Sequence, residues 1–385
     1  MKTKSKTSGY IIRSVAGSIL LSFAILSALF ASPRSTVSKP DAASLKVASA
    51  DLGDVAVDIG NSTIKKLSAV DGTVLWSVSV TNDGALAVDP SDLGVYTGYG
   101  NHNYVGSGTV YKYAANGTLK WTNSISVSGV CNFYYVSYAA VDATSARPGV
   151  VWTQTGCFGG IAKTSRSTGA QKWSTETNDI GRASIDPSNG QIYDITNAGP
   201  LYNYNTIYSV TADGNTLNSA SSCEGFSDLN PADGMLYRGG NRCGAILAQM
   251  DKVNLGATNW TLDLSSYISS LDALALQPWC GGYIYVASAA DSKIVVVDPA
   301  TRTVVRIFTT AIGTNNIAVN PAGGNLYITD GSTHFVYAYS PTGSLVWTSP
   351  DLGGAAGSIA APKGIIGMPT SLPHPTRSDP IPPPR

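Results

Sequence analysis

Short apolar runs alternate with polar turns along most of residues 51–368. The most regular stretch is Ile294–Asp330, where four runs follow one another: IVVVD, TVVRIFT, NIAVN and NLYITD. β-Branched and aromatic residues dominate the runs, whereas Pro, Gly, Asn and Asp are frequent in the turns. This combination is typical of short antiparallel strands joined by tight turns. The stretch therefore predicts a four-stranded antiparallel unit of about forty residues.

The unit recurs, and its first half is an apolar strand, a turn that usually contains Gly, and a strand that often ends in Trp. Its seven copies begin at Ile64, Val110, Ile161, Ile207, Leu247, Ile294 and Val336. Five of the seven Trp residues occupy the same position in these copies: Trp76, Trp121, Trp173, Trp260 and Trp347. A large ring that recurs at one position indicates a packing contact between successive units.

The second half is an apolar strand, a turn of the type Asp/Asn-Pro-x-x-Gly, and a strand with an aromatic residue. Its seven copies, some of them degenerate, begin at Leu86, Ala139, Ser184, Asp228, Leu274, Ile317 and Ser358. The folded region begins with a first half and ends with a second half, so the unit at each end is incomplete. Pairing of the two ends would close a ring and remove the open sheet edge.

The sequence thus predicts an all-β fold: a seven-bladed β-propeller over residues 51–368, made of four-stranded antiparallel blades and closed by its N- and C-terminal strands. The pattern resembles the PQQ-like and YVTN-type (surface-layer-protein-like) propellers. Ile294–Asp330 is most similar to the YVTN type, and copies such as DGTVLW (Asp71–Trp76) are similar to PQQ-like repeats. The resemblance implies the scaffold only, because such propellers include both enzymes and binding proteins.

The two ends of the chain lie outside this pattern. Residues 1–31 combine a basic start with the uncharged apolar run Val15–Ala31, which predicts a signal peptide or an uncleaved N-terminal anchor. Cleavage is favoured because the run is at the short limit for a membrane span. Residues 32–50 read as a flexible lead-in, and residues 369–385 as a Pro-rich disordered tail.

Composition agrees with export. Only 13% of residues are charged, and the formal net charge is zero, so the chain lacks the basic footprint of a nucleic-acid-binding protein. Together with the N-terminal segment, abundant Tyr and scarce charge predict a secreted, periplasmic or cell-surface protein. Membrane contact is expected only through residues 1–31, if they stay uncleaved.

The cysteines form two pairs at equivalent positions of two units. We expect disulfides Cys131–Cys157 and Cys223–Cys243, each worth ~3 kcal/mol in the loop-entropy model. The alternative is buried free thiols. Cys280 is left over, and the absence of a Cys-x-x-Cys-His motif excludes c-type haem.

One group of polar residues suggests a site. In a propeller, the residues just before the innermost strands surround one mouth of the channel. Here they are Asp83, Tyr135, Asp179, Arg182, Glu224, Asp272, Asn315 and Asn316. Their oxygens would suit a polar ligand or Ca²⁺, and crowded carboxylates would raise the pKa of a general acid. The alternative is that Asp and Asn simply begin strands and cap turns there.

We therefore expect an exported, non-catalytic binding or scaffold protein, with a protein or carbohydrate partner. One alternative is an enzyme with its site at the channel mouth, either a lactonase-like hydrolase or a quinoprotein-like oxidoreductase. No quinoprotein motif can be carried over residue by residue, no catalytic residue is assigned, and no cofactor is firmly implied. Another alternative is a self-assembling subunit of a surface layer or filament.

Overall fold

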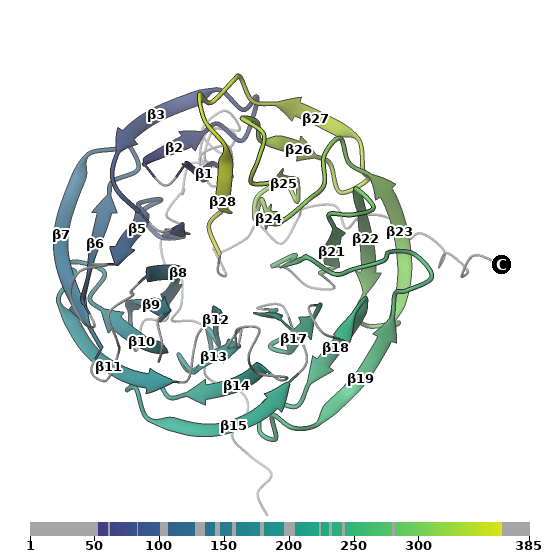
Figure 1. The fold of residues 1–385 in the computed structure, drawn as a ribbon, viewed down its shortest axis with the longest axis horizontal. Helices are drawn as coiled ribbons and strands as arrows, with labels where there is room; N and C mark the ends of the chain where they lie inside the picture. The colour runs from purple at the N-terminus through teal and green to yellow at the C-terminus, as the bar shows by residue number, and fades with distance from the viewer. Residues whose placement is uncertain are drawn as a thin grey trace, which may run out of the picture. The chain divides into compact units, whose positions relative to one another are not determined.

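Seven four-stranded antiparallel sheets form a ring around a central channel in the computed structural model of the chain (Figure 1). The structure describes residues 53–363, except 61, 83, 101–106, 128–134, 143–146, 156–158, 178–180, 196–204, 223–224, 231–232, 241–242 and 279–281. These described residues belong to one compact unit, and none of them forms a helix able to cross a membrane. The prediction of a seven-bladed propeller is confirmed. The predicted signal segment, lead-in and tail lie outside the described residues.

The strands of each blade follow one another from the channel outward. The innermost strands are β28 (Ala356–Ala360), β4 (Ala85–Val88), β8 (Tyr135–Asp142), β12 (Arg182–Ile185), β16 (Phe226–Leu229), β20 (Ala273–Leu276) and β24 (Asn316–Val319). The second strands are β1 (Val55–Ile59), β5 (Val95–Gly100), β9 (Gly149–Thr155), β13 (Ile192–Ile195), β17 (Leu236–Gly239), β21 (Ile284–Ser288) and β25 (Leu326–Thr329).

The outer half of each blade carries the first recurring pattern. The third strands are β2 (Thr63–Leu67), β6 (Ser107–Tyr113), β10 (Gly159–Thr164), β14 (Asn205–Val210), β18 (Ile246–Met250), β22 (Lys293–Asp298) and β26 (Tyr337–Tyr339). The outermost strands are β3 (Val74–Ser79), β7 (Leu119–Ser126), β11 (Gln171–Thr177), β15 (Thr216–Ser222), β19 (Thr258–Asp263), β23 (Thr303–Thr309) and β27 (Leu345–Thr348).

The C-terminal strand closes the ring as the sequence predicts. β28 pairs antiparallel with β1, placing Ala360 opposite Ala56 and Ile359 opposite Val57, so it completes the first blade. Beyond β28 the chain continues to Pro362, which forms a parallel bridge with Val88 of β4 in the second blade. The segment that closes the ring therefore also enters the channel region.

The recurring tryptophans join neighbouring blades. Trp121 of β7 lies against Gly169 in the β10–β11 turn of the next blade, and its indole Nε1 donates to the Arg166 carbonyl at 3.1 Å. Trp347 of β27 makes the same contact across the closure of the ring, over Gly72 and with its Nε1 3.1 Å from the Ala69 carbonyl. The interpretation of the Trp pattern as an interblade packing contact is confirmed for these blades.

Buried ion pairs add to the contacts within and between blades. Within the third blade, Lys163 Nζ lies 2.5 Å from a carboxylate oxygen of Asp142, and both side chains are almost fully buried. Between the third and second blades, the Arg166 guanidinium donates two hydrogen bonds to the buried Asp89 carboxylate, with Nε at 2.9 Å. Because both partners of each pair lose water together, each charge depends on the other.

Candidate functional site

Five inner strands each place one residue directly opposite a buried tyrosine of the second strand. That residue is alanine in three blades: Ala87, Ala275 and Ala318. In the neighbouring fourth and fifth blades it is Ser184, opposite Tyr193, and Asp228, opposite Tyr237. Two adjacent blades thus carry a polar side chain at a position where three other blades have alanine.

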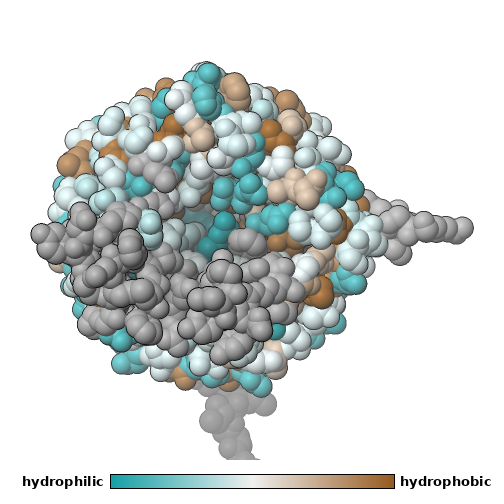
Figure 2. Space-filling model, in the orientation of Figure 1, coloured by the Kyte–Doolittle hydropathy of each residue, from teal (hydrophilic) through white to brown (hydrophobic). Residues whose placement is uncertain are grey.

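Both polar residues, Ser184 and Asp228, line a cavity in the channel. The cavity has a volume of about 360 Å³ and is lined by residues of all seven innermost strands together with Pro362 and Lys363. Viewed along the ring axis, hydrophilic residues lie along part of the hollow at the centre (Figure 2). The size lies at the lower end of the range for ligand pockets, so it suits a small molecule.

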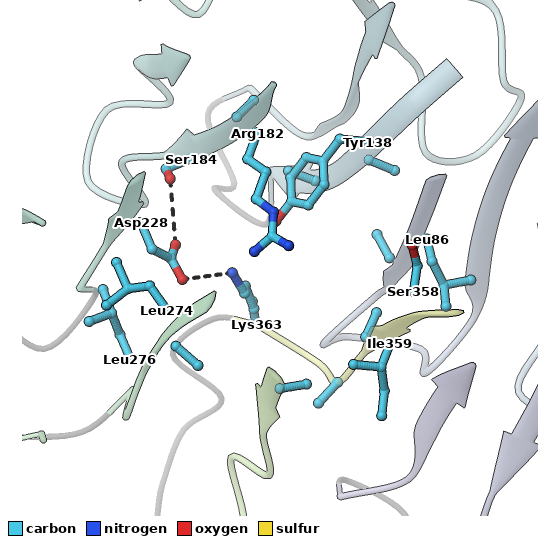
Figure 3. Close-up of a pocket in the computed structure, with 18 of the residues that line it drawn as sticks. Leu86, Tyr138, Arg182, Ser184, Asp228, Leu274, Leu276, Ser358, Ile359 and Lys363 are labelled. Carbon is cyan, nitrogen blue, oxygen red and sulfur yellow. Dashed lines mark hydrogen bonds and ion pairs between the residues drawn. The ribbon is translucent and has the colours of Figure 1, made fainter. Parts of the chain in front are cut away.

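Charged side chains converge on this cavity (Figure 3). Lys363 Nζ lies 2.8 Å from the Asp228 carboxylate, and the Ser184 hydroxyl lies 3.5 Å from the other oxygen of that carboxylate. Arg182, the first residue of β12, extends into the cavity with an Nη2 3.4 Å from the Asn316 amide oxygen. Tyr138 of β8 lines the cavity beside them. The cluster thus joins four blades and the segment after β28.

The Lys363–Asp228 pair keeps the ammonium group charged. Loss of water alone would lower the pKa of Lys363, but the Asp228 carboxylate outweighs that effect and raises the pKa above its usual value. The Lys363 side chain is 64% exposed because it stands in the open lumen, whereas the Asp228 side chain is 12% exposed. A protonated lysine is therefore held in the channel by a carboxylate that belongs to the wall.

The remaining wall is apolar. Leu86, Leu274 and Leu276 line the cavity, and each is less than a tenth exposed. Ile359 of β28 lies near Leu86 (Figure 3). The cavity therefore offers a charged region and an aliphatic region to the same small volume, an arrangement typical of sites that orient a ligand.

Of the residues predicted at the channel mouth, some line the cavity and others do not. Arg182 and Asn316 line the cavity together. Asp272 instead accepts hydrogen bonds from Ser270 and from the Ala289 backbone, and the Asn315 amide donates to the Asp330 carbonyl. Tyr135 begins β8, is 44% exposed, and is not among the lining residues. The remaining three predicted residues lie outside the described residues: Asp83, Asp179 and Glu224.

The Ca²⁺ and disulfide predictions depend largely on residues that are not described. No group of three or more His, Cys, Asp or Glu residues that could hold a metal occurs among the described residues, and three of the predicted carboxylates fall outside them. Cys243 is disulfide-bonded, whereas Cys131, Cys157, Cys223 and Cys280 lie outside the described part of the chain. The two disulfide pairings and Ca²⁺ binding stay predictions.

Sequence reasoning missed Ser184, Asp228, Tyr138 and Lys363. The residues predicted from the sequence lie at or before the starts of the inner strands, whereas Tyr138, Ser184 and Asp228 lie further along these strands and Lys363 follows β28. A comparison of the repeats at the alanine position would have found Ser184 and Asp228. Lys363 follows the last strand of a degenerate copy, so no repeat position marks it.

These features define a seven-bladed β-propeller with a cavity in its channel that is charged on one part of its wall and aliphatic on another. No protein-family model and no curated protein matches the sequence. The fold is similar to the crystal structure of a functionally unknown protein from Desulfotomaculum acetoxidans, with a TM-score of 0.60 and 14% identity over 80% of this chain and 99% of that one. A chain from a crystal structure of the mitotic checkpoint complex is similar with a TM-score of 0.54 and 12% identity, covering 72% of this chain and 83% of that one. At these identities the comparisons show the fold alone.

Proposed function

We propose that the protein is an exported, non-catalytic binding protein that holds a small ligand in its channel cavity. The observation that carries this proposal is the departure from the repeat at Ser184 and Asp228, where polar side chains replace alanine at the wall of the cavity. A propeller needs only small apolar residues there, as Ala87, Ala275 and Ala318 illustrate. Burying a carboxylate at such a position costs stability unless it is paired, and the partner of Asp228 is Lys363, which itself stands in the lumen.

Export is supported by the basic and then apolar start of residues 1–31 and by the low content of charged residues. The predicted disulfides would need an oxidising compartment. Intact-mass measurement of protein from the host tests both points. Loss of the N-terminal segment and of the thiol hydrogens of two disulfides is expected. A full-length chain with free thiols in the cytosolic fraction would contradict export.

Native mass spectrometry of the protein from its host tests channel binding. We expect an extra small-molecule mass that is released on unfolding. Ser358 of β28 lines the cavity, so Ser358→Phe should fill the lumen and abolish that mass. Ser124→Phe on the exposed face of the outermost strand β7 is the matched control and should keep it. Circular dichroism would confirm that both variants fold. Equal occupancy in both variants, or chemical turnover of the bound molecule, would refute the proposal.

A scaffold role is the second candidate, because large apolar side chains are exposed on several outermost strands. Leu75, Leu119, Leu217 and Leu345 are each between 50% and 57% exposed, on β3, β7, β15 and β27. Apolar side chains of this kind supply contact area in protein interfaces. Self-association in light scattering that is lost in Leu119→Ser and Leu345→Ser variants would favour the scaffold over the channel.

A further inference from the structure

The ion pair in the cavity has unused hydrogen-bonding capacity. Lys363 Nζ lies 2.8 Å from one carboxylate oxygen of Asp228, its hydrogen-bond partner among the described residues. The other oxygen accepts from the Leu229 backbone N–H at 3.0 Å and lies 3.5 Å from the Ser184 hydroxyl. An ammonium group has three donors, and a carboxylate has about four acceptor positions. Donors on Lys363 and acceptor positions on Asp228 therefore remain for a molecule in the lumen.

This pair offers a donor and an acceptor side by side, and the two charges oppose each other. Both residues line the cavity, and the Lys363 side chain is 64% exposed there. A small ion at the pair would be attracted by one member and repelled by the other. A hydroxyl group both donates and accepts a hydrogen bond. Two neighbouring hydroxyl groups of one ligand therefore match the carboxylate and the ammonium together.

Two hydroxyl groups of the wall are also available. Tyr138 on β8 and Ser358 on β28 line the cavity (Figure 3). Both side chains are half-buried, and neither hydroxyl has a hydrogen-bond partner in the described part of the chain. They belong to blades other than that of Asp228, so polar groups face the lumen from several sides. A ligand with several hydroxyl groups could use them as well as the ion pair.

The aliphatic wall lies next to the ion pair. Leu274 and Leu276 belong to β20, next in the ring after β16, the strand that carries Asp228. In Figure 3 these leucines lie close to Asp228 and Lys363. A ligand whose hydroxyl groups reach the pair therefore has room to lay its carbon skeleton on the leucines.

We propose that the channel binds a small vicinal diol, the class that includes sugars, with neighbouring hydroxyl groups on Asp228 and Lys363 and its carbon skeleton against Leu274 and Leu276. This inference rests on the proposed function, since it assumes that the ligand lies in the channel. Asp228 accepts from one hydroxyl, and Lys363 donates to the next. The volume of about 360 Å³ can enclose a molecule of the size of a monosaccharide.

Two isomers test the arrangement of the hydroxyl groups. Hexane-1,2-diol and hexane-1,6-diol contain the same atoms, but only the former can place neighbouring hydroxyls on the pair. Isothermal titration calorimetry of the mature protein compares them with hexanoate and hexylamine, which carry one charge on the same carbon chain. Hexane-1,2-diol should bind most tightly of the four, because it alone supplies adjacent groups that both donate and accept.

Variants of the pair test its role. Asp228→Ala and Lys363→Met should each weaken binding of the vicinal diol at least about tenfold, the lower limit for a hydrogen bond to a charged group. The double variant Asp228→Asn with Lys363→Gln keeps an acceptor and a donor without charge, so it should bind the diol more tightly than either single variant. Lys120→Gln, on the exposed face of β7, is the matched control and should leave the affinity unchanged. Circular dichroism would confirm that the variants fold, and Lys363→Met alone suffices if Asp228→Ala unfolds.

Several results would overturn the inference. They are no binding of the vicinal diol, equal or tighter binding of any other probe, unchanged affinity in Lys363→Met, and a double variant that binds no better than the single ones. None of these results touches the proposed function if the native mass still shows a ligand that Ser358→Phe displaces. Absence of any channel ligand in the native mass, together with no binding of the four probes, would instead refute both proposals.

Discussion

At the scale of single residues, the buried charges of the second and third blades are held by specific partners. The Asp89 carboxylate accepts hydrogen bonds from the Arg166 guanidinium and from the hydroxyl and backbone of Ser91. Burial alone would raise the pKa of Asp89, but these hydrogen bonds and the Arg166 charge outweigh it and lower the pKa below its usual value. Asp89 therefore links the acid stability of the fold to one interblade contact.

A lowered pKa in the folded state stabilises the protein above the ordinary pKa of Asp, about 3.9, and this contribution is lost as the pH falls through the folded value. We expect Arg166→Met to lower the free energy of unfolding by about 1.5–3 kcal/mol at pH 7 and by less at pH 3. Urea unfolding at both pH values measures the difference. Arg147→Met is the control, since the pair that Arg147 forms with Asp213 is exposed and should contribute less than about 1 kcal/mol. Equal losses for Arg166→Met at both pH values would contradict the linkage.

The candidate site was partly predictable at this scale. Arg182 and Asn316 were found because each begins an inner strand, and the topology of a propeller turns those positions toward the channel. Asp272 and Asn315 have the same sequence signature, yet their side chains bond to nearby loop atoms. Sequence position fixes which mouth a residue is near, but the local turn decides whether its side chain faces the lumen.

At the scale of strands and turns, the repeat could be recognised in the sequence because β-branched and aromatic residues mark the strands, whereas Pro, Gly, Asn and Asp mark the turns. The same contact between Trp and a turn glycine recurs, and it depends on both partners. Gly169 has a φ of +73°, and a Cβ there would lie 2.6 Å from the ring of Trp121. The turn therefore needs glycine for two reasons, its backbone conformation and its closeness to the indole.

Gly169→Ala should separate these two reasons when compared with Gly331→Ala. Gly331 has a similar φ of +76°, but a Cβ added there would meet no atom within 4 Å. We expect Gly331→Ala to cost about 1 kcal/mol, the cost of a left-handed backbone for alanine. Gly169→Ala should cost at least about 1 kcal/mol more, because it also displaces the indole. Thermal or urea unfolding measures the stability of both variants. Equal losses of stability would show that the Trp121 indole can move away from the added methyl group at position 169 without destabilising the protein.

Two blades lack the recurring Trp, and the sixth blade replaces it in a way that sequence alone did not explain. Arg306 of β23 takes the position opposite the third strand where five other blades have Trp, and its guanidinium donates to the Pro341 carbonyl at 2.6 Å. Phe308 then covers Gly343, the turn glycine of the next blade. The two functions of a Trp, ring packing and a hydrogen bond, are here divided between two side chains.

At the scale of the whole molecule, ring closure was predicted from the unpaired halves at the two ends of the repeat. The cavity was not predicted, because its lining combines strands that are far apart in sequence with the segment after β28. Asp228 and Lys363 are 135 residues apart in the chain. Periodicity reveals elements and their neighbours, whereas such a pair depends on the complete ring.

Removal of the closing strand should therefore disrupt more than one blade. A chain ending at Gly354 lacks β28, exposes the inner edge of β1 and loses Lys363. We expect it to aggregate or to elute as an expanded species in size-exclusion chromatography, because an open strand edge recruits other chains. A chain ending at Met368 lacks only the predicted Pro-rich tail and should elute and unfold like the full-length chain. A compact monomer without β28 would contradict this role.

The late position of Lys363 has a consequence for synthesis. A chain emerges from the ribosome with its N-terminus first, so the six blades that follow the first one are made before the strand that completes it. Lys363 comes three residues after the end of that strand. The cavity therefore gains its second cation only when the propeller is whole, and occupancy of the channel would distinguish a finished molecule from a truncated one.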